Sequence, residues 1–282
     1  MSLKIKGLNT GILLHEEKFL ALALKIRNDN EQTEIFYMQV SVLKDFLMLL
    51  QNRLISLVRR AQLDMESLRI LAEKANQELA GNIPQIEMND VQNPDPGRLI
   101  TSLSASFRDD YFNLLFCLQN EQISHLQIQD VQIEFLIMAI SQAMNNAGSQ
   151  EIAQQITVAL DFLPLYDSLF APDNSMDYSQ YQHEGWKMEL FNNYILIMYR
   201  TETQNGSELL CGSVIKTNVI AGSKEAENIA RLFASLSQKL SPYYSQITHI
   251  YTQPLEVEKN ITPTLEQALR PLAAFRKSLM GE

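Results

Sequence analysis

The side chains that could perform acid–base, nucleophilic or metal chemistry are few and scattered along this chain. The four histidines, His15, His125, His183 and His249, show no ligand-like spacing, and no HExxH or CxxC pattern accompanies them. The phosphate-loop pattern GxxxxGKS/T, the dinucleotide pattern GxGxxG and the nucleophile-elbow pattern GxSxG do not occur either. We therefore expect no metal, no cofactor and no catalytic residues, and the motifs favour a protein that is not an enzyme.

Two cysteines are the remaining candidates for nucleophilic chemistry. Cys117 could act as a nucleophile if His125 faced it across a hairpin and water could reach it. Its position inside the apolar run Leu114–Leu118 instead indicates a buried thiol, and Cys211 also lies in an apolar strand pattern. Unpaired thiols of this kind are typical of a reducing cytoplasm.

Aromatic residues with one polar edge are the other candidates for a binding site. Tyr178, Tyr181 and Trp186 could line a groove, or they could hold a loop on the surface. Together with Cys117 and His125, Tyr178 and Trp186 are the residues that a cleft between repeats would use.

Charged clusters are more simply explained as solvated surface. Asp109 and Asp110 occupy a tight turn, where adjacent side chains point apart. Arg53, Arg59 and Arg60 lie at helical spacing among acidic neighbours, which predicts a solvated helix face.

The elements that would position these residues follow a pattern that occurs three times. In each copy an apolar strand reaches a polar turn, an aromatic residue opens a strongly alternating strand, and a further strand and a helix follow. The turns are His15–Phe19, Arg108–Phe112 and Phe191–Ile195. The pattern predicts an α+β fold of repeated antiparallel ββ(β)α units with one long helix.

The predicted domain organisation follows from these repeats and from two segments rich in Pro, Asn and Asp. The predicted ranges are a first βββα unit with the long helix (1–81), a connector (82–98), a second βββα unit with an amphipathic helix at 150–160 (99–170), a connector (171–185) and a third βββα unit with a C-terminal strand and helix (186–282). The third unit is expected to open with a hairpin of Lys187–Phe191 and Tyr194–Thr201. Ser41, Asp130 and Ser223 are the predicted N-caps of the helices that end the strand patterns of the first, second and third units, respectively.

The long helix is predicted from Ser41 to about Ala80, because this span contains neither Pro nor Gly. Its apolar residues recur at alternating three- and four-residue steps, which permits a self-associating seam. The alternative is that the helix packs on the sheet of its own chain, and the additional apolar residues beside the seam favour it. The candidate interface residues are Leu43, Leu47, Leu50, Leu54, Leu57, Leu68 and Leu71.

Composition and charge exclude several classes of protein. The net charge is −10, and from 75 to 186 the only basic residues are Arg98 and Arg108. Such an acidic segment disfavours binding to nucleic acid or to anionic lipid, and it is compatible with a basic protein partner. No apolar run approaches the length of a membrane span, and Met1–Lys6 does not resemble a signal peptide, so we expect a soluble cytoplasmic protein.

The segments around Ser41–Leu43, Asp130–Gln132 and Leu160–Asp167 resemble the uncharacterised enterobacterial YjeJ family in length and order. That resemblance implies no established activity or binding residues, and it favours an accessory protein over a housekeeping enzyme. The sequence thus predicts a non-enzymatic interaction or assembly module that acts through its long amphipathic helix or a sheet edge. A homo-oligomer or a protein partner would follow from this function. The alternative is an enzyme or small-ligand binder with its site in a cleft between repeats.

Overall fold

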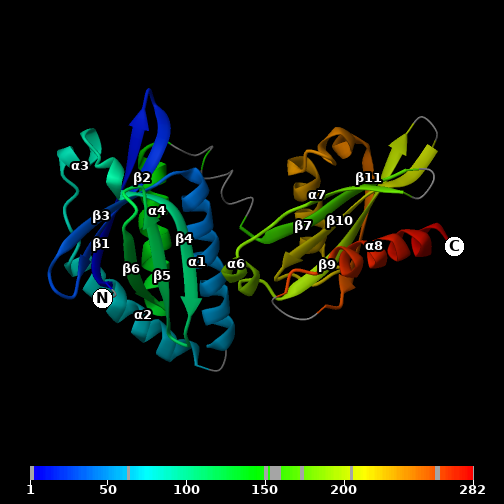
Figure 1. Cartoon of the computed structure of the whole chain (residues 1–282). Helices are drawn as coiled ribbons and strands as arrows, with labels where there is room; N and C mark the ends of the chain where they lie inside the picture. The colour runs from blue at the N-terminus through cyan, green and yellow to red at the C-terminus, as the bar shows by residue number, and fades with distance from the viewer. Residues whose placement is uncertain are drawn as a thin grey trace. The chain divides into compact units, whose positions relative to one another are not determined.

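The chain folds into two compact units, residues 1–160 and residues 161–282, which are called the N-terminal and C-terminal units below. The structure is a computed structural model that describes residues 3–61, 64–148, 152, 160–171, 175–203, 206–257 and 261–281. Figure 1 shows both units, with the chain coloured from blue to red. Each unit contains one sheet and several helices, so the fold is of the mixed α+β class.

The N-terminal unit begins with a long hairpin whose turn residues, Glu16 and Glu17, have φ values of 50° and 64°. Two positive φ values give a turn whose twist suits an antiparallel hairpin. The strands and helices of this unit are β1 (Leu3–His15), β2 (Lys18–Asn28), β3 (Thr33–Met38), α1 (Val40–Arg60), α2 (Met65–Gly81), α3 (Met88–Gln92), the 3-10 turn η1 (Pro96–Arg98), β4 (Leu99–Phe107), β5 (Tyr111–Leu118), β6 (Ile123–Gln129), the 3-10 turn η2 (Asp130–Gln132) and α4 (Ile133–Asn146).

Six strands of this unit close into a barrel in the order β1 to β6. Successive strands pair antiparallel within β1–β3 and within β4–β6. Two short parallel pairings join the groups: Tyr37 pairs with Leu99, and Leu3 pairs with Leu126. The rings of Phe36 and Phe116 lie 5.4 Å apart and those of Phe46 and Phe116 lie 6.5 Å apart, so α1 contributes directly to the core between strands.

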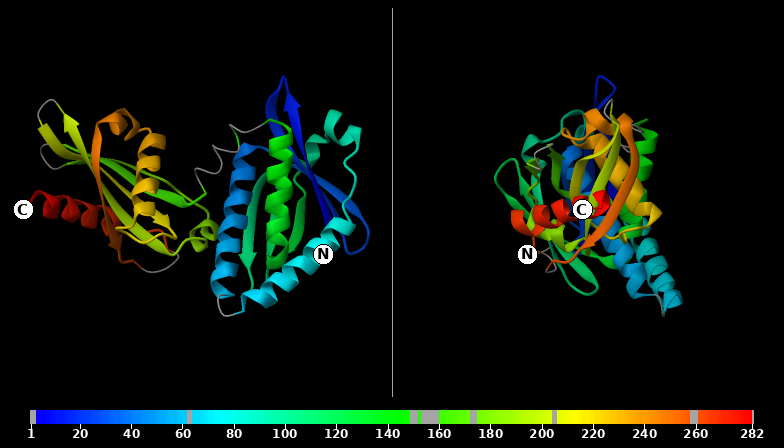
Figure 2. Two further views of the ribbon diagram at one scale, coloured as in Figure 1. Left: turned by 180° about the vertical axis from the view of Figure 1, so that it is seen from behind. Right: turned by 90° about the vertical axis from the view of Figure 1, so that its right-hand side faces the viewer.

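The span predicted as one long helix forms two helices, α1 and α2. The second starts at Met65, where the Asp64 carboxylate accepts a hydrogen bond from the Ser67 amide as an N-cap. In Figure 2, α2 runs obliquely to the adjacent pair of α1 and α4. The prediction of one helix is therefore wrong, because Asp64 caps the start of a second helix within the predicted span.

Two of the three predicted N-caps are also wrong. α1 begins at Val40, one residue before Ser41, and its N-cap Gln39 makes no side-chain capping bond. Asp130 forms ion pairs with α1 instead of capping a helix. The third prediction is confirmed, since the Ser223 hydroxyl accepts a hydrogen bond from the Ala226 amide at the start of α7 (Lys224–Leu236).

The C-terminal unit is a five-stranded antiparallel sheet between helices. Its remaining elements are β7 (Phe162–Phe170), β8 (Met176–Gln180), α6 (Gly185–Glu189), β9 (Asn193–Thr203), β10 (Gly206–Thr217), the 3-10 turn η3 (Ser241–Gln246), β11 (Ile247–Leu255) and α8 (Leu265–Met280). The strand order is β11-β9-β10-β7-β8. Both edge strands are poor pairing templates, because β8 has only five residues and β11 contains Pro254.

Helices α7 and α8 cover opposite faces of this sheet. Cys211 belongs to the buried cluster formed with α7, whereas a Cβ added at the next residue, Gly212, would lie 3.2 Å from Leu272 of α8. Successive residues of a strand point to opposite faces, so the two helices lie on different sides. The hydroxyls of Tyr166 and Tyr194 hold the segment before α8 by donating to the carbonyls of Pro263 and Ile261.

Several segments differ from their predicted assignments. Lys187–Phe191 was expected to be a strand, but α6 covers its first part. β7, assigned to the second repeat, pairs with β10 in the C-terminal sheet, and the predicted connector 171–185 contains β8. The connector 82–98 contains α3 and η1. The predicted helix at 150–160 lies outside the described residues except for Ile152 and Leu160.

Candidate functional site

The predicted interface leucines divide into three groups by exposure. Leu43 and Leu50 are completely buried in the N-terminal unit, so they belong to its own core. Leu71 on α2 is 55% exposed, with Ile70 beside it at 57%. The partly buried remainder are Leu47, Leu54, Leu57 and Leu68. An interface between two chains that used all seven predicted leucines would require the core of the N-terminal unit to unfold locally and expose Leu43 and Leu50.

Cys117 and His125 lie on neighbouring strands and are both exposed. Cys117 pairs with Ile123, and His125 pairs with Leu115, so the two residues are diagonal neighbours on the outer face of β5 and β6. The prediction of a buried Cys117 is wrong, because the even-numbered residues of β5 fill the core. Cys211 is buried as expected, and burial raises the pKa of its thiol to about 12.

Tyr178 and Trp186 lie in the C-terminal unit, so neither unit by itself brings the four predicted cleft residues together. Tyr178 is 42% exposed on the edge strand β8. Trp186 is buried in α6, with the Lys187 ammonium 5.5 Å from its ring centroid.

Two of the three arginines predicted as a solvated face form ion pairs with a buried carboxylate of the N-terminal unit: Arg53, which is largely buried, and Arg60, which is 42% exposed. Arg59 is exposed, as predicted. Arg53 and Arg60 bind the two carboxylate oxygens of buried Asp130 at 2.7 and 2.6 Å. Both also donate to the backbone carbonyl of Asp109, in the turn between β4 and β5. The two arginines therefore connect α1 both to η2 and to the turn between β4 and β5. They bind this turn through the backbone carbonyl of Asp109 and not through its carboxylate.

A second buried polar network lies in the C-terminal unit. The Asp167 carboxylate accepts hydrogen bonds from the hydroxyls of Tyr181 at 2.7 Å and Ser237 at 2.5 Å, and from the Ser179 amide. Burial and the bond to Asp167 raise the pKa of Tyr181 to about 12. With Asp167 only 1% exposed, the network joins β7, β8 and the end of α7 and has a structural role.

Metal binding finds no support in the part of the chain that the structure describes. No group of three or more His, Cys, Asp or Glu side chains in that part could hold a metal ion. Nor does any described helix combine the length and apolarity needed to cross a membrane.

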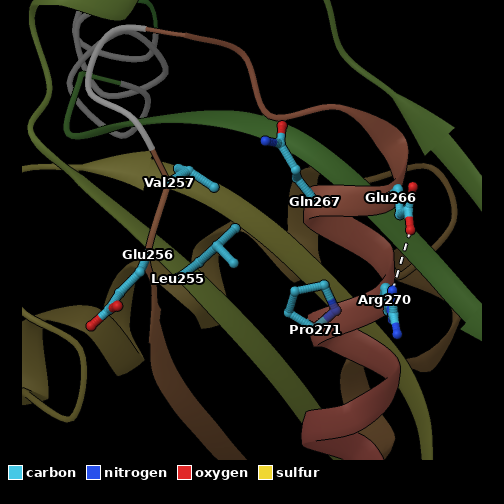
Figure 3. A pocket seen from close by; sticks show the side chains of 7 residues that line it. All are labelled: Leu255, Glu256, Val257, Glu266, Gln267, Arg270 and Pro271. Carbon is cyan, nitrogen blue, oxygen red and sulfur yellow. Dashed lines mark hydrogen bonds and ion pairs between the residues drawn. The ribbon is translucent and has the colours of Figure 1, made fainter.

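One open pocket of about 750 Å³ lies between the end of β11 and the first turns of α8. Figure 3 shows Leu255 and Pro271 on opposite sides of it. Glu266 and Arg270 form an ion pair at 3.3 Å along the helix, and Glu256 adds a second carboxylate. Two of the three charged side chains in this pocket thus pair with each other within α8, and the third is a single carboxylate. This arrangement does not indicate which ligand the pocket would bind.

A groove of about 350 Å³ in the N-terminal unit has a more distinctive lining. It runs between α4, β1 and the segment after α2, and it is called the α4 groove below. Its lining residues are Leu8, Asn9, Thr10, Ile83, Phe135, Met138, Ala139, Gln142, Ala143 and Asn146. None of them is charged, although 20% of the chain is.

One face of α4 lines the α4 groove along its length. Its α4 residues recur at three- and four-residue steps from Phe135 to Asn146, a length of about 16 Å at 1.5 Å per residue. Its floor is fixed because the Thr10 hydroxyl donates to the Ala139 carbonyl at 2.8 Å. Ile83 and Met138, on its two sides, are 47% and 51% exposed. Sequence reasoning missed the groove because it joins distant segments, and the stepped apolar residues of α4 were its one visible signal.

Comparisons with known proteins agree on one family. The family model described as YjeJ-like matches residues 1–281. The protein named "Uncharacterized protein YjeJ" from Escherichia coli (strain K12) is 32% identical over 280 residues, covering 98% of this chain and 96% of that protein. No solved structure matches the chain significantly.

Proposed function

This chain belongs to the YjeJ-like family, and on that premise we propose that it is a non-enzymatic assembly module that pairs with a second copy of itself. The observation that carries this proposal is the uncharged α4 groove with an exposed apolar side chain on each side. A helix lying in an apolar groove is a recurring mode of protein recognition.

Charge argues for a second copy as the occupant. Each chain has a net charge of −10, so two copies repel each other over most of their surfaces. A groove without charged side chains is a place where two such chains can meet without like-charge contacts.

The shape of the patch supports the same pairing. Met138 and Ile83 project beside a hollow of the same surface. A patch that carries both projections and a hollow can be self-complementary about a twofold axis, the commonest symmetry of soluble oligomers. Met138 of each copy would then enter the groove of the other.

Light scattering across a dilution series, with matched variants, tests this function. We expect the wild-type chain to be a dimer that dissociates on dilution. Met138→Glu and Ile83→Glu, both at exposed positions, should each raise the dissociation constant by about tenfold or more, since a carboxylate would be buried unpaired. Leu71→Glu, at an equally exposed position on α2, should leave the dimer intact.

Two outcomes would contradict the proposal. A wild-type chain that stays monomeric at the highest concentration would remove self-assembly altogether. A dimer broken by Leu71→Glu and unaffected by Met138→Glu would place the interface on the outer face of α2, where the sequence predicted it. Circular dichroism of each variant shows whether the fold is retained.

A further inference from the structure

An open pocket of about 560 Å³ lies at one end of the N-terminal barrel, where β3 and β6 begin. Residues 32–34 line it at the start of β3, residues 122–124 line it at the start of β6, and Arg98 of η1 also lines it. It is called the rim pocket below. Ligand sites commonly occur at the mouths of barrels.

The two turns that lead into β3 and β6 have the same geometry. Glu31 and Glu121 have φ values of 63° and 66°. The backbone carbonyls of Gln32 and Gln122 each accept a hydrogen bond at 2.9 Å across their turn. The backbone therefore places one glutamine on each side of the rim pocket.

Both glutamine side chains present an amide NH2 group to the pocket. The Oε1 atom of Gln32 accepts from Asn28 at 3.4 Å, and that of Gln122 accepts from Asn120 at 3.2 Å. These bonds hold each amide through its carbonyl, and within the described residues neither NH2 group has a protein acceptor. Both glutamines are exposed, so a ligand can reach these donors.

The deeper part of the rim pocket lies over the aromatic core of the barrel. Glu34 precedes Phe36 by two residues, and Ser124 pairs with Phe116, whose ring lies 5.4 Å from that of Phe36. Arg98 donates from Nη1 to the Glu34 carboxylate at 3.1 Å, and its guanidinium lies 6.0 Å from the Phe36 ring centroid. The ion pair thus forms a polar floor above apolar rings.

The charges of the rim pocket balance. Arg98 and Glu34 are the charged side chains of its lining, and they pair with each other at 32% and 25% exposure. An anion would compete with Glu34 for Arg98, and a cation would compete with Arg98 for Glu34. A neutral ligand leaves this pair intact, so the pocket favours an uncharged ligand.

The remaining polar groups include both donors and acceptors. The two glutamine amides donate, the second carboxylate oxygen of Glu34 accepts, and the hydroxyls of Thr33 and Ser124 do both. A ligand hydroxyl can donate and accept as well, so several hydroxyls on one ligand can match these groups. Ile123, which is 60% exposed, adds an apolar surface for the C–H groups of such a ligand.

We propose that the rim pocket binds a neutral polyhydroxylated ligand of monosaccharide size. The glutamine amides and Glu34 bind its hydroxyls, and Ile123 covers its C–H face. The volume of the pocket lies within the range of small-molecule sites. This role is independent of self-assembly through the α4 groove, because the two sites share no lining residue.

Saturation-transfer NMR of the full chain with glucose, galactose, ribose and myo-inositol, followed by titration, tests the proposal. We expect at least one of these four probes to bind saturably at one site per chain. Glucuronate, which adds a carboxylate to the glucose ring, and cyclohexanol, which has a single hydroxyl, should each bind at least about tenfold more weakly than the best neutral probe.

Matched variants show whether binding occurs in the rim pocket. Gln122→Leu removes one amide donor and should weaken binding of the best probe by about fivefold or more. Gln119→Leu makes the same change at an exposed position of the same turn outside the lining, and it should leave binding unchanged. Glu34→Gln releases Arg98 from its partner and should increase the affinity for glucuronate by about fivefold or more.

Ser124→Ala is a second pocket variant, which should weaken binding even if Gln122→Leu disturbs its turn. The proposal is overturned if none of the four neutral probes binds, or if neither Gln122→Leu nor Ser124→Ala weakens binding. A loss with Gln119→Leu as large as that with Gln122→Leu would overturn the assignment to this pocket. Glucuronate binding to the wild type as tightly as the best neutral probe would overturn the neutral ligand.

Discussion

At the scale of single residues, Gly7 is required because β1 passes very close to the backbone at the end of α2. A Cβ built at Gly7 would lie 1.9 Å from the backbone oxygen of Asn82, a distance that no rotamer change can relieve. Gly7→Ala should therefore force the strand and the helix end apart and lower the free energy of unfolding of the N-terminal unit by about 2 kcal/mol or more. Urea denaturation followed by circular dichroism measures this loss.

Gly11, on the same strand, provides the control for that substitution. A Cβ at Gly11 would meet only the flexible end of the Ile86 side chain, at 3.3 Å. Gly11→Ala should accordingly cost much less than Gly7→Ala. Equal losses in the two variants would mean that the close approach at Asn82 is not the cause.

Lys216 gives the C-terminal unit a pH dependence of unusual sign. It is completely buried, donates to the Met188 carbonyl and lies 4.7 Å from the Tyr194 ring centroid. Burial lowers its pKa from 10.5 to about 8, partly opposed by Glu189. Lys216 thus has a pKa of about 8 in the folded chain and 10.5 in the unfolded chain. Between pH 8 and pH 10.5 the unfolded chain binds more protons than the folded chain, so the contribution of this residue to stability rises with pH.

Comparison with Lys216→Met isolates this effect. From pH 7 to pH 10.5 the unfolding free energy of the wild type should rise relative to the variant by about 3 kcal/mol, at 1.36 kcal/mol per pH unit of pKa difference. The raised pKa of Cys211 acts in the opposite direction above pH 9, but it is common to both proteins and cancels. A difference that stays constant over this range would contradict a lowered pKa for Lys216.

Whether a strand residue is buried can be predicted from the sequence only if the alternation of inward and outward side chains is assigned correctly. The apolar neighbours of Cys117 suggested burial, but its odd-numbered position places its side chain on the exposed outer face of β5. The pairing of Arg53 and Arg60 with the buried Asp130 carboxylate could not be foreseen, because it joins residues that are far apart in sequence. The α4 groove was missed for the same reason.

At the scale of elements, the division between α1 and α2 depends on the capping of the second helix. Replacing Asp64 with Ala removes the bond from the Ser67 amide and should destabilise the N-terminal unit by about 1 kcal/mol. Thermal or urea unfolding followed by circular dichroism is the appropriate measurement.

Ser41→Ala is the paired experiment. Ser41 was predicted as a cap, but it lies exposed inside the first turn of α1. Its replacement by a better helix former should be neutral or slightly stabilising. A cost of about 1 kcal/mol for Ser41→Ala would show that it caps the helix after all.

The hairpins were the elements best predicted from sequence. The turn predicted at Arg108–Phe112 does join two antiparallel strands, β4 and β5, because alternation and a polar turn are signals that act over a short range of sequence. The long helix was wrong because apolar spacing continues through a region where Asp64 starts a new helix. The spacing of apolar residues indicates which face of a helix is buried, but it does not show where one helix ends and the next begins. The capping residue determines the start of a helix.

At the scale of the whole molecule, each sheet is complete within its own unit, which predicts that the units unfold separately. The single tryptophan of the chain, Trp186, lies in the C-terminal unit, so its fluorescence reports the unfolding of that unit alone. Gly7→Ala should shift the circular dichroism transition of the N-terminal unit and leave the fluorescence transition in place. If both signals shift together, the two units unfold as one cooperative body.

The closed order of the N-terminal barrel has a consequence for the kinetics of folding. Its hairpins join residues that are close in sequence, whereas its two parallel pairings join Tyr37 to Leu99 and Leu3 to Leu126, separations of 62 (99 − 37) and 123 (126 − 3) residues. Closing the longer loop costs only about 0.6 kcal/mol more entropy than the shorter one if each forms alone. Hairpins should therefore form first, and the two closures that complete the barrel should set the folding rate of this unit.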